Sequence, residues 1–128
     1  MTDSTLISNK VKKLLIIEDE ADICLLLNIM LKEEDIELDH VNSLAKAKAH
    51  LEMEQPALIL LDNKLPDGLG IDFIEFLKDN YPAVKIIMIS GFLPGTIKDV
   101  ALNNGADIYL EKPFTRDKIY QSVHQLLS

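Results

Sequence analysis

Short apolar runs that alternate with helix-spaced segments are the feature that most restricts the fold of this 128-residue chain. Five runs occur, at residues 14–17, 36–41, 57–61, 84–89 and 107–110. Alternation of this kind predicts βα units and a parallel sheet rather than hairpins. Because 48% of the residues are hydrophobic, a single domain of this length can bury a substantial core.

The runs differ in a way that orders them across the sheet. Runs 57–61 and 84–89 are nearly continuously hydrophobic, which is typical of central strands covered on both faces. Run 36–41 alternates apolar and polar residues, so it is predicted to be an edge strand. Ser43 and Thr115 stand where side chains commonly cap the first turn of a helix, and we expect helices to begin just after them.

The segment after the first run predicts an amphipathic helix. Its apolar residues fall at relative positions 0, 3, 4, 7 and 8, namely Ile23, Leu26, Leu27, Met30 and Leu31. We expect this stripe to face the core. Cys24 lies among these residues and is interpreted as a small buried hydrophobic residue.

Charge and composition exclude several function classes. With 21 acidic against 13 basic residues the net charge is −8, so nucleic-acid phosphates would be repelled and direct binding to them is not expected. A single cysteine cannot form an internal disulfide, which fits a reducing compartment. No window reaches the roughly 18 apolar residues of a membrane span, so we expect no membrane association and a cytoplasmic location. Residues 1–11 are expected to form a polar extension and residues 12–127 the domain.

Polar side chains follow the runs at the point where the strands should end. Glu18 and Asp19 follow the first run, Asp62 the third, Ser90 the fourth and Lys112 the fifth. Right-handed crossovers place the carboxyl ends of parallel strands on one edge of the sheet. If the first and third strands are neighbours, three carboxylates meet there, and like charges about 4 Å apart repel by roughly 4 kcal/mol at an effective dielectric near 20. Oxygen ligands alone favour Mg²⁺ as the compensating cation.

A phosphoryl-transfer chemistry follows from these residue types. With a divalent ion to screen both charges, Asp62 can attack phosphorus as a nucleophile. Lys112 can place its ammonium against the phosphoryl oxygens, and Ser90 can donate one hydrogen bond to them.

Three histidines and one glycine-rich segment are given simpler interpretations. His40, His50 and His124 are expected on the wet side of an edge strand or on helix surfaces rather than as metal ligands. The segment Gly68-Leu69-Gly70 lacks the third glycine of a dinucleotide-binding loop and is interpreted as a turn into a helix.

Five motifs occur in order along the chain: Ile17-Glu18-Asp19-Glu20, Leu61-Asp62 with Pro66-Asp67-Gly68, Ser90-Gly91, Gly105-Ala106, and Glu111-Lys112-Pro113-Phe114. Together they resemble the receiver domain of two-component response regulators, of the stand-alone chemotaxis type. The resemblance implies an α/β, single-domain, flavodoxin-like (βα)5 three-layer sandwich. It also implies a parallel five-stranded sheet of order 2-1-3-4-5.

The resemblance also implies site roles. Asp62 would accept a phosphoryl group from a histidine kinase or a histidine phosphotransfer protein. Asp19, Asp62 and the main-chain carbonyl of Lys64 would bind Mg²⁺ directly, and Glu18 would act through water. The protein would not be an enzyme for other substrates, because it would catalyse only its own phosphorylation and dephosphorylation.

Signal output is implied in the same way. Ser90 and Tyr109 match the family's switch pair, in which the hydroxyl follows the phosphoryl group and the ring turns inward. The fourth helix, fifth strand and fifth helix would then present a changed surface to a downstream protein target. A phosphorylation-dependent homodimer is compatible with this output.

Two positions suggest control of the phosphorylated lifetime. Lys64 lies two residues after Asp62 and Phe92 two residues after Ser90. We hypothesise that both restrict the hydrolytic water and lengthen the lifetime of the phosphorylated state.

Two alternative functions compete with a phosphoacceptor. An aspartate-nucleophile phosphohydrolase would use similar groups, but it needs a second aspartate at the position of Lys64. A pseudo-receiver that is never phosphorylated would act only as a binding module.

Overall fold

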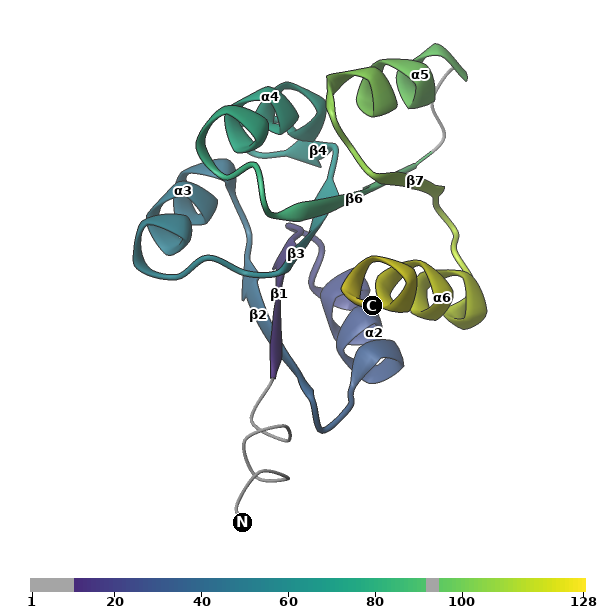
Figure 1. The fold of residues 1–128 in the computed structure, drawn as a ribbon. Helices are drawn as coiled ribbons and strands as arrows, with labels where there is room; N and C mark the ends of the chain where they lie inside the picture. The colour runs from purple at the N-terminus through teal and green to yellow at the C-terminus, as the bar shows by residue number, and fades with distance from the viewer. Residues whose placement is uncertain (1–10, 92–94) are drawn as a thin grey trace.

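The computed structural model describes residues 11–91 and 95–128 (Figure 1). Its main sheet is parallel and has the order β2-β1-β3-β6-β7. The strands of this sheet are β1 (Lys12–Ile17), β2 (Ile36–Val41), β3 (Leu58–Asp62), β6 (Lys85–Ser90) and β7 (Ile108–Glu111). The helices are α2 (Ala21–Leu31), α3 (Leu44–Met53), α4 (Gly70–Asn80), α5 (Gly95–Asn104) and α6 (Arg116–Leu127).

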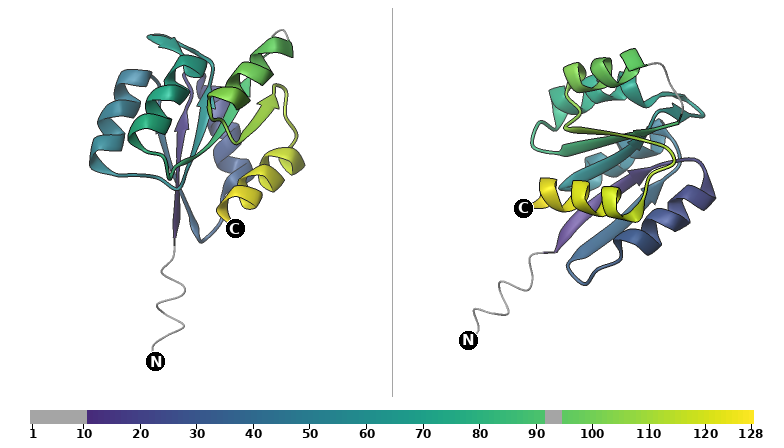
Figure 2. Two further views of the ribbon diagram at one scale, coloured as in Figure 1. Left: turned by 45° about the horizontal axis from the view of Figure 1, so that its top comes forward. Right: turned by 90° about the vertical axis from the view of Figure 1, so that its right-hand side faces the viewer.

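The sheet lies between two helical layers. Helices α3, α4 and α5 cover one face, and α2 and α6 cover the other (Figures 1 and 2). Since β6 and β7 are the fourth and fifth strands of this sheet along the chain, the predicted order 2-1-3-4-5 and the flavodoxin-like fold are confirmed. A second, two-stranded antiparallel sheet formed by β4 (Lys64–Leu65) and β5 (Gly68–Leu69) was not predicted.

Two apolar clusters form because successive side chains of a strand point to opposite faces. Leu15 and Ile17 of β1 pack in the cluster under α3, α4 and α5, whereas Leu14 and Ile16 pack in the cluster under α2 and α6. All five residues of β3 are buried, as predicted for a central strand. The edge position of β2 is also as predicted.

Both predicted helix caps are present. The Ser43 hydroxyl accepts a hydrogen bond from the Lys46 amide at 3.1 Å, and the Thr115 hydroxyl accepts one from the Lys118 amide at 3.1 Å. Each cap satisfies a backbone donor that the first turn of a helix leaves without a partner.

Helix α2 packs on the sheet through most of its predicted stripe. Cys24, Leu27 and Leu31 are buried, so the interpretation of Cys24 is confirmed, and Ile23 and Met30 are partly buried against the same cluster. Leu26 departs from the prediction, because it is 39% exposed. Ile29, outside the predicted stripe, is 67% exposed, as the prediction requires.

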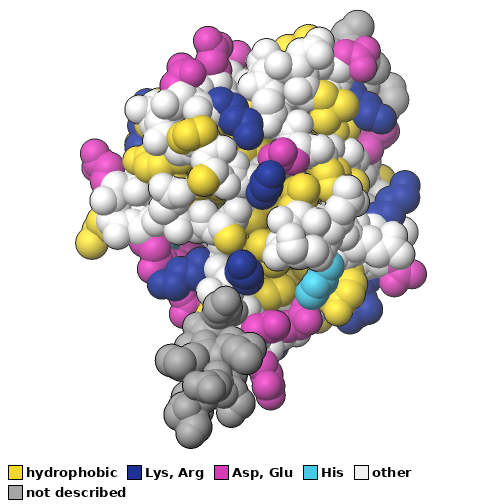
Figure 3. All heavy atoms as spheres, in the orientation of Figure 1, with side chains coloured by type: hydrophobic (Ala, Val, Ile, Leu, Met, Phe, Trp, Pro, Cys, Tyr) yellow, Lys and Arg dark blue, Asp and Glu magenta, His cyan; other side chains and the backbone are white. Residues whose placement is uncertain are grey.

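Charged and hydrophobic side chains are both exposed at the surface. On the face drawn in Figure 3, acidic and basic side chains lie next to each other, with hydrophobic groups between them. Within residues 11–91 and 95–128, no helix has the length and apolar character needed to cross a membrane.

Candidate functional site

Three carboxylates meet at the carboxyl end of the sheet. Strands β1 and β3 are neighbours, with Ile17 paired to Leu61, so Glu18 and Asp62 leave the sheet side by side. One ligand oxygen from each of Glu18, Asp19 and Asp62 lies within 4.8 Å of the other two. The structure therefore brings together the three acidic residues that the sequence selects.

A lysine from the opposite side of the site contacts two of these carboxylates. The Lys112 ammonium donates to Glu18 Oε1 at 3.0 Å and to Asp62 Oδ1 at 3.1 Å. Glu18 is 2% exposed and Asp62 6% exposed, whereas Asp19 is exposed. Low solvent access strengthens these charge–charge contacts relative to a surface ion pair.

Burial and charge act on the site in opposite directions. Burial raises the pKa of Glu18 above its usual value, although the Glu20 amide and Lys112 oppose that shift. Burial lowers the pKa of Lys112, but its contacts with Glu18 and Asp62 outweigh burial and leave the pKa raised. Lys112 is therefore held as a cation between the two buried carboxyl groups.

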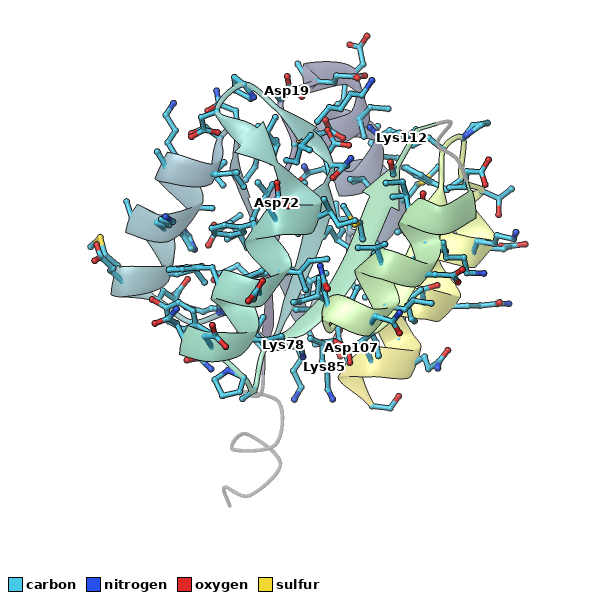
Figure 4. All side chains as sticks on the ribbon, turned by 90° about the horizontal axis from the view of Figure 1, so that it is seen from above. Asp19, Asp72, Lys78, Lys85, Asp107 and Lys112 are labelled. Atoms are coloured by element: carbon cyan, nitrogen blue, oxygen red, sulfur yellow. The ribbon has the colours of Figure 1, made fainter. Side chains whose placement is uncertain are left out.

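The two ends of the molecule carry different charged groups. Figure 4 shows Asp19 and Lys112 at the end that holds the carboxylate cluster, and Lys78, Lys85 and Asp107 gathered at the opposite end. The Lys78 ammonium lies 4.0 Å from Asp107 Oδ2, which also accepts a hydrogen bond from a backbone amide. Lys78 and Asp107 therefore form an ion pair that is separate from the candidate site.

Hydrogen bonds that the sequence did not indicate connect the residue after Asp62 to the start of α4. Buried Asn63 accepts from the Gly70 amide through its carbonyl oxygen at 2.7 Å and from the Ile71 amide through Oδ1 at 3.0 Å. A side-chain carbon on Gly70 would come 2.1 Å from the Asp62 carbonyl oxygen. Gly70, interpreted only as part of a turn, therefore permits α4 to begin directly against Asp62.

Two further residues hold the loops around the site. Asp67 accepts from the amides of Leu44 and Ala45, both at 2.9 Å, so this segment is fastened to the start of α3. His40 Nε2 lies 2.8 Å from the Glu18 carbonyl oxygen. His40 is exposed, as expected for a surface residue, but its contact with the Glu18 carbonyl was not predicted.

The remaining selected residues lie on the fourth and fifth strands of the sheet. Ser90, 2% exposed, ends β6 beside Asp62, and its carbonyl accepts from the Lys112 amide at 2.6 Å. Tyr109 of β7 is half-buried and packs against the cluster under α5. Lys64 is exposed in β4, and Phe92 lies outside the described residues.

The arrangement fits a divalent cation by its chemistry. Three carboxylates converge at this point. Among the described residues, one ammonium, that of Lys112, contacts them. When all three carboxylates are ionised, two negative charges therefore remain to be balanced. The ligand atoms that Glu18, Asp19 and Asp62 offer are carboxylate oxygens, which suit Mg²⁺ better than a metal that prefers nitrogen or sulfur.

Comparisons with known proteins identify the family. Residues 14–124 match the family model described as the response regulator receiver domain. The chain therefore belongs to the receiver domain family of two-component response regulators, as its motifs predict.

Individual relatives agree with this assignment. The chain is 38% identical over 100 residues to the KDP operon transcriptional regulatory protein KdpE of Escherichia coli, covering 78% of this chain and 44% of KdpE. It is similar to a CheY-like receiver domain protein from Methanospirillum hungatei, with a TM-score of 0.85, 29% identity and coverage of 91% and 94%. The beryllofluoride-activated NtrC4 receiver domain dimer gives a TM-score of 0.86 at 31% identity, with coverage of 91% and 96%.

The curated relatives are longer than the matched region. The chain spans 44% of KdpE, 25% of PilR from Pseudomonas aeruginosa and 62% of RegA from Cereibacter sphaeroides. The similarity therefore concerns the receiver domain that these proteins share.

Proposed function

We propose that this protein is a phosphoacceptor in which Asp62 takes a phosphoryl group from a histidine kinase or a histidine phosphotransfer protein. The observation that carries the proposal is the buried contact of Lys112 with both Asp62 and Glu18. A turn-starting aspartate needs neither a buried lysine nor two further carboxylates within 4.8 Å. A carboxylate that must approach a phosphoryl group needs both.

The transfer uses the groups in the following way. Asp62 attacks the phosphorus of a phosphohistidine, a new oxygen–phosphorus bond forms, and the electrons of the broken nitrogen–phosphorus bond remain on the imidazole of the donor. Mg²⁺, when bound, screens the charges of the carboxylate and of the phosphoryl oxygens. Lys112 transfers its hydrogen bond from Asp62 to a phosphoryl oxygen, and Ser90 donates another.

The metal ligands in this proposal come from the acidic cluster and the segment after β3. Asp19 and Asp62 bind Mg²⁺ directly, the main-chain carbonyl of Lys64 supplies a further oxygen, and Glu18 acts through water. The exposure of Asp19 beside two buried carboxylates supports an ion that retains part of its water shell.

A phosphodonor can dock beside this site. A hollow of about 240 Å³ is lined by Ile23, Leu26, Lys112, Pro113 and Phe114. Lys112 contributes both to this hollow and to the contact with Asp62. An apolar segment seated there would bring its histidine to the carboxylate cluster.

Output is proposed at the surface of α5, β7 and α6, where a downstream protein target binds. A second hollow of about 270 Å³ lies there, and its lining includes Lys98, Tyr109 and Lys118. Since Tyr109 belongs to this hollow and to the proposed switch pair with Ser90, inward rotation of its ring would change the hollow. A phosphorylation-dependent homodimer through the same surface is also part of the proposal, and the similar NtrC4 receiver domain forms a dimer when it is activated with beryllofluoride.

The decisive experiment is chemical phosphorylation. The protein is incubated with acetyl phosphate or phosphoramidate and Mg²⁺, and any labile phosphate is located by mass spectrometry. We expect one adduct on Asp62, lost in Asp62→Asn and in the absence of Mg²⁺. Wild-type protein without an adduct would leave the pseudo-receiver as the function, and rapid turnover of a generic phosphate ester would favour the phosphohydrolase.

The lifetime of the adduct tests the proposed roles of Lys64 and Phe92. We expect Lys64→Asn and Phe92→Ala each to raise the decay rate of phosphorylated Asp62 severalfold, because each opens a route for the hydrolytic water. Decay at the wild-type rate in both variants would refute this role.

Catalysis by the protein is limited in this proposal to its own phosphorylation and dephosphorylation. We place that reaction in the cytoplasm, and the single buried cysteine supports this location because it fits a reducing compartment.

A further inference from the structure

A second group of metal-ligating side chains lies away from Asp62, between the edge strand β2 and helix α3. One atom from each of Asp39, His50 and Glu54 lies within 4.8 Å of the others. The side chains are 40%, 23% and 34% exposed, respectively, so water and ions can reach them. The group is independent of the proposed phosphoacceptor function.

The fold explains why these three residues meet. His50 and Glu54 are four residues apart at the end of α3, a spacing that places two side chains on the same helix face. Asp39 belongs to β2 and lies two residues before Val41, which packs in the cluster under α3. Because alternate residues of a strand share a face, Asp39 also faces α3.

The three ligand atoms approach one point, and His50 is not hydrogen bonded to either carboxylate. His50 Nε2 is 3.6 Å from Asp39 Oδ2 and 3.9 Å from Glu54 Oε1, and both separations exceed a hydrogen bond. In a tetrahedral site with bonds of about 2.0–2.2 Å, ligand atoms lie roughly 3.3–3.6 Å apart. Side-chain shifts of a few tenths of an ångström would therefore produce the geometry of a bound ion.

A neighbouring lysine orients one of the ligands. Lys13 binds Glu54 through Oε2, and its ammonium also lies 3.5 Å from Glu37. This contact leaves Glu54 Oε1 directed toward His50. The hydrogen bond from Lys13 lowers the pKa of Glu54, so this carboxyl is held in the ionised form that a metal requires.

We propose that Asp39 Oδ2, His50 Nε2 and Glu54 Oε1 form a binding site for Zn²⁺, with water at the fourth position. Imidazole nitrogen and carboxylate oxygen are both ligands of Zn²⁺, and the imidazole disfavours Mg²⁺. The sequence predicted His50 as a surface histidine, and this proposal adds a role as a metal ligand. The bound ion would join β2 to α3.

Zinc binding to the 128-residue chain is measured by calorimetry in the presence of saturating Mg²⁺, which occupies the carboxylates around Asp62. Co²⁺ is used in parallel, because its visible absorption reports tetrahedral coordination by nitrogen and oxygen. We expect one Zn²⁺ per chain. His50→Gln and Asp39→Asn should each weaken binding at least tenfold, since each removes one ligand atom.

The matched control is His124→Gln. His124 also contacts a carboxylate, with Nε2 at 2.5 Å from Glu33 Oε2, but it does not belong to a three-residue group of this kind among the described residues. Binding unchanged in His124→Gln and weakened in His50→Gln supports the site. If the wild type binds no Zn²⁺ at 100-fold excess, or if only Asp19→Asn weakens binding, the proposal is wrong. Melting curves without metal confirm that each variant folds.

Discussion

Gly70 determines how closely the chain can pass Asp62. In Gly70→Ala the new methyl group would lie 2.1 Å from the Asp62 carbonyl oxygen, and this backbone atom cannot move without shifting β3. We expect a loss of about 1–3 kcal/mol in the free energy of unfolding, measured by urea denaturation. Phosphorylation by acetyl phosphate should slow in parallel, because α4 would be displaced from the site.

Gly91→Ala serves as the matched control for this substitution. A side-chain carbon at Gly91 has nothing within 4 Å among the described residues. The free energy of unfolding should therefore change by less than about 0.5 kcal/mol. Equal losses in the two variants would show that helix or loop propensity, and not the approach to Asp62, causes the effect.

Residues that end a buried run could be selected from the sequence, whereas residues that act through distant contacts could not. Glu18, Asp62 and Lys112 each follow an apolar run, and parallel topology alone places them on one edge. Asn63 and His40 act through hydrogen bonds to residues 8 and 22 positions away. Their side chains are ordinary for a turn and an edge strand, so nothing local marked them.

At the scale of secondary structure, Asp67 links the segment that follows Asp62 to helix α3. Its two carboxylate oxygens accept from the first two amides of α3, while Ser43 caps the third. Asparagine has a single acceptor oxygen, so Asp67→Asn leaves one of these amides facing an NH₂ group. We expect the melting temperature at pH 7 to fall by about 3 °C, measured by circular dichroism.

The effect of Asp67 should depend on pH in a defined direction. The backbone hydrogen bonds from Leu44 and Ala45 lower the pKa of Asp67 below its ordinary value of 3.8. A carboxyl with a lowered pKa in the folded state stabilises above 3.8 and loses this contribution as the pH falls through its folded value. The difference between wild type and Asp67→Asn should therefore shrink below about pH 4. A difference that stays constant as the pH falls from 7 to 2 would contradict the assignment.

The elements themselves were predictable to different degrees. The edge position of β2 and the central positions of β3 and β6 followed from which runs alternated and which were continuous, whereas the full strand order came from the family resemblance. Both N-caps were correct. The inward side of α2 was predicted except at Leu26, because periodicity assigns a residue to a helix face but does not show how far the rest of the protein covers it. The β4–β5 hairpin was missed because two-residue strands have no recognisable periodicity.

At the scale of the whole molecule, folding itself assembles the acidic cluster. Glu18 and Asp62 are 44 positions apart in sequence and approach one another only when β1 and β3 pair. Their mutual repulsion opposes folding, and Lys112 offsets part of it. A cation that binds the folded cluster and not the unfolded chain must therefore stabilise the entire domain.

Magnesium should raise the melting temperature of the protein, and Asp19→Asn should remove that response. At ten times the dissociation constant, binding to the folded state alone contributes about 1.4 kcal/mol, which corresponds to roughly 3–5 °C for a domain of this size. Asp19 is exposed, so its substitution should leave the melting temperature without metal nearly unchanged. Asp22→Asn, an exposed aspartate in the first turn of α2, should keep the full response to Mg²⁺. If Mg²⁺ stabilised Asp19→Asn as much as the wild type, the ion would bind elsewhere and the ligand set at Asp62 would have to be revised.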